Sequence, residues 1–215
     1  MIRKIFAVMI LATVLMTGCG LWEDSPEAAL NEIIVALATK KEEKLAVRAD
    51  LDEFFSETYD TITIELAKKY DEYKEKYPKD EYFQHSAEFL TEYNMSRKAA
   101  HLKFLNDVKE SFFAEIPEPE KLEENPTAYV ANEFEKIRRA TKATIKETRI
   151  DNKHATITLL LEGDDSLQGK FIGEMTLKLG FSKDSKDNWH FDKIENLDEL
   201  MPVLVDKAER AWINL

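Results

Sequence analysis

The sequence is poor in cysteine and glycine, and both scarcities exclude classes of protein. Its 215 residues include one cysteine, Cys19, and six glycines. A single cysteine cannot form a disulfide within the chain, so stability must come from a packed core, for which the chain is long enough. The few glycines form no phosphate-binding loop, dinucleotide fingerprint or Gly-x-Ser-x-Gly sequence. The commonest nucleotide and serine-hydrolase motifs are therefore missing.

Basic residues are also scarce relative to acidic ones. Lysine and arginine number 30 against 42 aspartates and glutamates, which gives a formal net charge of −12. An acidic surface is repelled by phosphate groups, whereas a nucleic-acid-binding protein carries a basic patch. We therefore do not expect nucleic acid as a partner.

The first 19 residues have the three-part layout of a secretory signal peptide. Arg3 and Lys4 precede an uncharged run from Ile5 to Met16, and small residues follow just before Cys19. A transmembrane helix needs about 20 apolar residues to cross about 30 Å of hydrocarbon, so this run is too short. The alternatives are an ordinary cleaved signal and a buried helix with a lone buried cysteine.

The end of this segment resembles the lipobox of bacterial lipoproteins. The matching residues are Leu15-Met16-Thr17-Gly18-Cys19, with Met16 where leucine is usual. The resemblance implies cleavage between Gly18 and Cys19 and lipid attachment to Cys19. It also implies anchoring at the cell membrane or outer membrane, facing the periplasm or the exterior. Residues 19–24 would then form a lipidated tether, and residues 25–215 a single domain.

Helical spacing dominates from residue 25 to 138. Ser25 can cap a helix that begins at Pro26 and carries apolar residues every three or four positions. After a charged break at 40–44, a longer helix is expected from about Asp50 until Pro78 stops it. Further helical spacing extends to about residue 116, and one more helix is expected over 129–137.

Near residue 142 the apolar period changes from 3.6 to 2, which is typical of an antiparallel sheet with one wet face. We expect four strands, at about 142–150, 154–162, 169–181 and 188–194, with Phe171, Met175 and Leu177 on the core face. Asn196 and Glu199 resemble a capping box for a last helix over 197–213, whose regular part would start near Pro202. The predicted class is α+β, with N-terminal helices packed on a curved C-terminal sheet.

Three segments of the domain resemble bacterial lipoproteins of the cystatin-like, nuclear-transport-factor-two-like group. They are Pro26-Glu-Ala-Ala-Leu30, Ile150-Asp-Asn-Lys-His-Ala-Thr-Ile157 and Lys183-Asp…Asn188-Trp189-His-Phe-Asp-Lys193. The resemblance implies helices packed into a curved sheet around a cone-shaped cavity. The helical block at 50–116 departs from the compact members of the group. The group includes carriers, enzymes and proteins without known activity, so it does not select a function.

Two sets of residues are candidates for a site. His190 and Asp192 lie two apart on an expected strand and could form a base and its orienting acid, or merely a solvated surface pair. A tyrosine group could contact a partner or ligand, or complete a seam between two helices. Its members are Tyr70, Tyr73, Tyr77 and Tyr82.

No metal or cofactor is expected from the sequence. The four histidines show no metal-ligand spacing, and the acidic run at 162–165 lacks the regular ligand pattern of a calcium loop and is read as a turn. The leading interpretation is a non-catalytic envelope lipoprotein that binds a small ligand or partner protein. The alternatives are a small hydrolase or isomerase with a cystatin-like cavity, and an envelope assembly partner.

Overall fold

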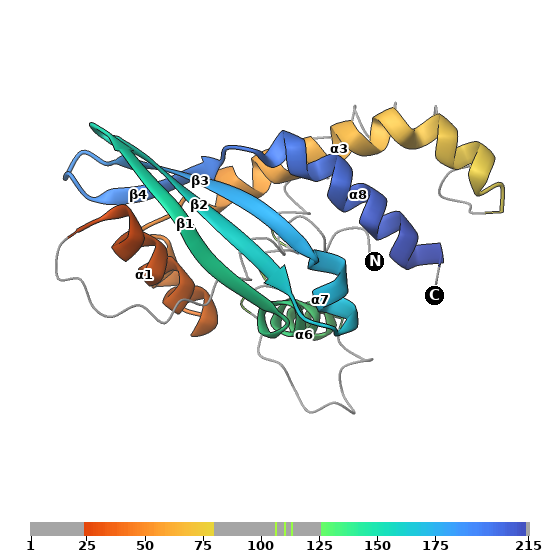
Figure 1. Cartoon of the computed structure of the whole chain (residues 1–215), viewed down its shortest axis with the longest axis horizontal. Coiled ribbons are helices and arrows are strands. Elements are labelled where there is room, and N and C mark those ends of the chain that lie inside the picture. Colours follow the sequence, from red (N-terminus) through yellow and green to blue (C-terminus); the bar gives the residue numbers. More distant parts are fainter. Residues whose placement is uncertain (1–23, 80–105, 107–109, 111–112, 114–125, 214–215) are drawn as a thin grey trace.

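The computed structural model describes residues 24–79, 106, 110, 113 and 126–213 (Figure 1). The predicted signal peptide, Cys19 and Tyr82 lie outside these residues. In the described part of the chain, every helix is too short or too polar to cross a membrane.

The first helices form where the sequence predicts them. In α1 (Pro26–Ala38), the Ser25 side chain accepts a hydrogen bond from the Ala28 N–H at 3.1 Å, and Pro26 occupies the start. A four-residue helix that was not predicted, α2 (Glu42–Leu45), follows in the charged break and buries Leu45. The helix α3 (Leu51–Lys76) is capped by Asp50 and ends just before Tyr77 and Pro78, as expected.

A helix and a four-stranded sheet follow. The helix α6 (Pro126–Arg139) leads directly into β1 (Thr141–Asp151), and β2 (His154–Gly163), β3 (Glu174–Lys183) and β4 (Trp189–Ile194) complete the sheet. Neighbouring strands are antiparallel in the order β1-β2-β3-β4. The predicted α+β class is confirmed: helices precede an open antiparallel sheet and one helix follows it (Figure 1).

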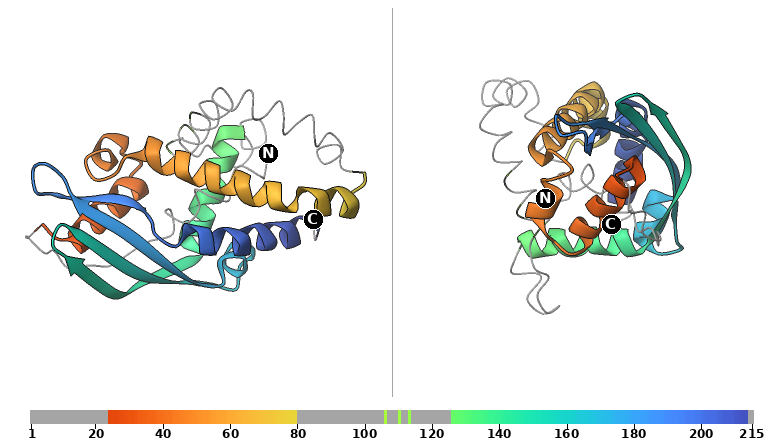
Figure 2. Two further views of the ribbon diagram at one scale, coloured as in Figure 1. Left: turned by 90° about the horizontal axis from the view of Figure 1, so that it is seen from above. Right: turned by 90° about the vertical axis from the view of Figure 1, so that its left-hand side faces the viewer.

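The core lies between the concave side of the sheet and the helices that pack against that side (Figure 2). Alternate residues of β2 and β3 point into it, including Met175 and Leu177, which are 6% and 0% exposed. The Phe191 ring of β4 contacts Phe54 of α3 and Phe181 of β3 edge to face, each with ring centroids 5.7 Å apart. Met175 and Leu177 therefore lie in a packed cluster.

The prediction of a strand over 169–181 is wrong in its first part. Residues Leu167–Ile172 form a short helix, α7, and β3 begins only at Glu174. The Ser166 side chain caps α7 by accepting a hydrogen bond from the Gly169 N–H at 3.0 Å, and Gly173 ends it at φ +61°. Phe171, which we expected on the core face of the strand, is therefore a helical residue.

The last helix, α8 (Leu197–Ile213), also differs in two details. Its helical geometry starts at Leu197 and passes through Pro202, so the proline does not mark the start of the regular part. The predicted capping box is wrong as well, because the Asn196 side chain bonds to the backbone of β3 instead. Figure 2 shows α8 running alongside α3.

Candidate binding groove

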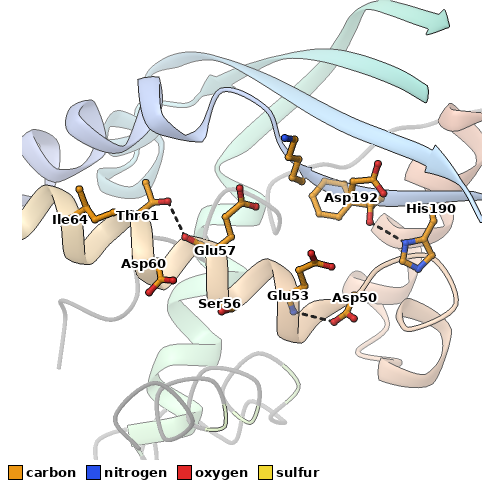
Figure 3. Close-up of a pocket in the computed structure, with 11 residues that line it drawn as sticks. Asp50, Glu53, Ser56, Glu57, Asp60, Thr61, Ile64, His190 and Asp192 are labelled. Atoms are coloured by element: carbon orange, nitrogen blue, oxygen red, sulfur yellow. Dashed lines mark hydrogen bonds between the residues drawn. The ribbon is translucent and has the colours of Figure 1, made fainter. Parts of the chain in front are cut away.

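An open groove of about 700 Å³ lies between the first half of α3 and the strand β4 (Figure 3). The helix contributes most of its walls, and the strand contributes four consecutive residues. The lining residues are Asp50, Glu53, Ser56, Glu57, Asp60, Thr61, Ile64, His190, Phe191, Asp192 and Lys193.

The helical repeat explains why so many carboxylates line one groove. Asp50, Glu53, Glu57 and Asp60 are spaced three, four and three residues apart, so they lie along one side of α3. Asp192 adds a fifth carboxylate from the strand. Among the lining residues that the structure describes, Lys193 is the one lysine or arginine, so this part of the groove carries a strong negative charge.

The segment before α3 holds the helix against β4. Ala49 forms a parallel bridge with Phe191, whose N–H donates to the Arg48 carbonyl oxygen at 2.7 Å. The Phe54 ring then packs on Phe191 from the core side. The two walls of the groove are thus joined by backbone pairing and by an aromatic contact.

The Arg48 guanidinium strengthens this junction from the other side. It donates to Glu32 at 2.7 Å, to Asp24 at 3.0 Å and to the Trp189 carbonyl oxygen at 3.0 Å. Asp24 in turn accepts a hydrogen bond from the Trp189 N–H at 3.0 Å. Asp24, which is expected from the sequence to end the tether, therefore meets α1 and the first residue of β4 at one arginine.

Glu57 is the carboxylate whose acidity the groove changes. Partial burial raises the pKa of Glu57, and the nearby charges of Asp198 and Glu53 raise it further. The charge of Lys193 acts in the opposite direction. Since the net effect is an increase, Glu57 holds its negative charge less readily than a free carboxylate does.

The predicted pair His190 and Asp192 lies in this groove, but the two side chains bond to other groups. Nδ1 of His190 lies 3.1 Å from the Phe191 carbonyl oxygen, and the Asp192 carboxylate accepts a hydrogen bond from the Ser182 hydroxyl at 2.7 Å. Gly180 pairs with Lys193 and Phe181 with Phe191, which leaves Asp192 as an extra residue on its strand. The bulge helps to explain why the simple spacing of two does not join acid and imidazole.

Of the tyrosine group, Tyr73 and Tyr77 face α8. Tyr73 is 4% exposed, and the Tyr77 hydroxyl donates to Glu209 at 2.6 Å. Lys76 bonds to the same carboxylate at 2.5 Å, and Lys69 pairs with Asp206. These contacts are those of a seam between two helices, and the contact of the tyrosines with a partner stays a prediction. The side chain of Tyr70 lies outside the described part of the structure.

No three histidine, cysteine or acidic side chains are grouped for a metal ion among the described residues. In the acidic run at 162–165, Asp164 accepts hydrogen bonds from the Ser166 N–H at 2.9 Å and from its hydroxyl. These bonds lower the pKa of Asp164. Glu162 and Gly163 thus end β2, and Asp164 and Asp165 lie in the connection that leads into α7.

The carboxylates of α3 and Lys193 were not among the residues singled out from the sequence. Their spacing of three and four is visible in the sequence, but the sequence gives no sign that β4 lies opposite. Comparisons with protein-family models, curated proteins and solved structures find no match for the chain.

Proposed function

We propose that the protein is a lipid-anchored envelope protein that binds a positively charged ligand in the groove between α3 and β4, without catalysing a reaction. The anchor is supported by the lipobox-like sequence that ends at Cys19. The ligand is supported by one observation: the described residues that line the groove include five carboxylates and a single lysine. A concave surface with one sign of charge concentrates ligands of the opposite sign.

The rigidity of the walls supports binding in a preformed site. The backbone bond between Phe191 and Arg48 and the ring contact between Phe191 and Phe54 fix α3 against β4. A preformed site loses less conformational entropy when a ligand binds. We therefore expect the groove to bind a ligand without rearrangement of α3.

One observation favours a second candidate, a small hydrolase or isomerase. His190 lines the groove together with Asp192, so an imidazole and a carboxylate border the same open space. A ligand could draw the two side chains together, because catalytic hydrogen bonds often form only in the substrate complex. Turnover of any compound that disappears in His190→Ala would favour this candidate over simple binding.

The binding proposal can be tested with the full-length protein in detergent micelles. The probe is an oligolysine peptide, titrated by calorimetry at low salt. Glu53→Gln combined with Glu57→Gln should weaken binding by about tenfold, because two of the five carboxylates among the described lining residues are replaced by neutral amides. The matched control is Glu162→Gln with Glu174→Gln, which removes two exposed charges from the outer face of the sheet. Equal binding by both double variants would contradict the proposal.

The anchor is tested separately by Cys19→Ser. The wild-type protein should carry the added mass of acyl chains and sediment with membranes, because each buried methylene contributes about 0.8 kcal/mol of membrane affinity. The variant should lose both properties. A wild-type protein of unmodified mass would contradict the anchor while leaving the groove untouched.

A further inference from the structure

The first strand of the sheet has a long outer edge. β1 spans 11 residues, and in the described ranges no strand other than β2 pairs with it. It lies at the border of the sheet in Figure 1. Such an edge presents unpaired N–H and C=O groups that can pair with another strand.

A bulge divides β1 into two halves. Ile145 pairs with Leu159 and Glu147 pairs with Thr158, so Lys146 is an extra residue. Before the bulge, the odd-numbered residues face the core, as the buried Ala143 shows. After it, the even-numbered residues do, because Thr148 pairs with the buried Ile157 and Ile150 with the buried Ala155.

This change of parity determines how β1 could pair with a copy of itself. In a regular strand that pairs antiparallel with a copy of itself, core-facing residues lie opposite each other only when the two residue numbers are both odd or both even. Here a residue before the bulge must lie opposite a residue after it, so an odd-numbered core-facing residue must lie opposite an even-numbered one. One register of this kind places Lys146 opposite Glu147 and also Lys142 opposite Asp151.

We propose that the outer edge of β1 is a homodimer interface, in which β1 pairs antiparallel with β1 of a second copy in this register. The strand charges support the choice of partner. Lys142, Lys146, Glu147 and Asp151 are all exposed, and the two-fold symmetry forms each opposite-charge pair twice.

Neighbouring registers are disfavoured by the same charges. A shift by two residues in one direction would place Lys146 opposite Arg149, and a shift in the other would place Lys142 opposite Arg149. Like charges directly opposite each other destabilise a strand pair. The proposed register is therefore the one that pairs each of these lysines with an acid.

The core-facing residues of β1 fit the same register. Ile150 is 59% exposed, although Ala155, which lies opposite it on β2, is buried. In the dimer it would lie opposite Ala143 of the second copy, and Ile145 would lie opposite Thr148. The second copy would thus cover apolar surface that the single chain leaves in water.

A charge exchange tests both the dimer and its register. The full-length protein in detergent micelles is examined by light scattering after size separation, which gives the mass of the protein part. We expect two chains for the wild type. Lys142→Asp or Asp151→Lys alone should weaken association by about tenfold, and the two together should restore it. The control, Lys178→Asp, changes an exposed charge on β3 and should leave the dimer intact.

A second measurement does not depend on affinity. In the variant with Ala143→Cys and Ile150→Cys, mild oxidation in native membranes should yield two chains joined by disulfides, since the two positions face each other in the dimer. A variant with Ala143→Cys and Lys178→Cys should not cross-link. A single-chain mass at all concentrations would overturn the proposal. Capture of β1 by a different protein in place of a second copy would also overturn it. So would a dimer that the exchanges leave unchanged.

Discussion

At the scale of single residues, Asn196 replaces a missing piece of strand. Ile194 is the last residue of β4 that pairs with β3. Beyond it, the Asn196 side chain accepts a hydrogen bond from the Lys178 N–H at 2.9 Å and donates one to the Thr176 carbonyl oxygen at 3.0 Å. The residue is 6% exposed, so water cannot readily substitute for these bonds. The side chain thus continues the hydrogen bonding of β3 beyond the end of its neighbour.

We expect Asn196→Ala to lower the free energy of unfolding by about 2 to 4 kcal/mol, because two backbone groups of β3 lose their partners. Chemical denaturation followed by circular dichroism measures the loss. Asn188→Ala is the control, since the Asn188 side chain makes one long hydrogen bond to Asp184, at 3.4 Å. Equal losses in the two variants would show that Asn196 does not have this role.

At the scale of elements, α7 can fold back on the end of β2 because two glycines touch. A Cβ on Gly163 would lie 1.9 Å from the Gly169 carbonyl oxygen, and a Cβ on Gly169 would lie 2.2 Å from Asp164. We expect Gly163→Ala to destabilise the fold by more than about 2 kcal/mol, because backbone must move. Thermal unfolding measures this. Gly180→Ala should cost less, since its Cβ would meet the flexible side chain of Glu195 at 3.1 Å.

The contact between Gly163 and Gly169 also explains why the sequence predicts α1, β2 and β3 but not α7. The strands β2 and β3 are visible because their apolar residues alternate, and α1 is visible from Ser25, Pro26 and its apolar spacing. The helix α7 is too short to show a period of 3.6, and its position depends on the packing of Gly169 against Gly163. The sequence pattern before β3 therefore predicts an extension of that strand.

The sequence predicts each wall of the candidate groove separately, but it does not predict that the two walls meet. The sequence places His190 and Asp192 close together on a strand and spaces the carboxylates of α3 along one side of a helix. The meeting of the two depends on Phe191, which bonds to Arg48 and packs on Phe54. These residues are far apart in the sequence, and no local pattern links them.

At the scale of the whole molecule, groove binding and folding stability should depend on Glu57 in opposite ways. Burial, with Asp198 and Glu53, raises the pKa of this carboxyl, so the folded state holds the proton more tightly than the unfolded state does. Stability from this group is therefore present at low pH and is lost as the pH rises from the unfolded pKa through the higher folded pKa. A positively charged ligand, in contrast, needs the ionised form.

We therefore expect Glu57→Gln to stabilise the free protein slightly at neutral pH while weakening oligolysine binding about fivefold. As the pH falls through the raised pKa of Glu57, wild-type affinity should decline toward that of the variant, because the carboxylate becomes neutral. Thermal unfolding and calorimetric titration at several pH values measure the two effects. The difference between the two proteins isolates Glu57 from the other groups that line the groove, because both proteins share them. If Glu57→Gln lowered stability and left binding unchanged at every pH, the carboxylate would serve the fold and not the groove.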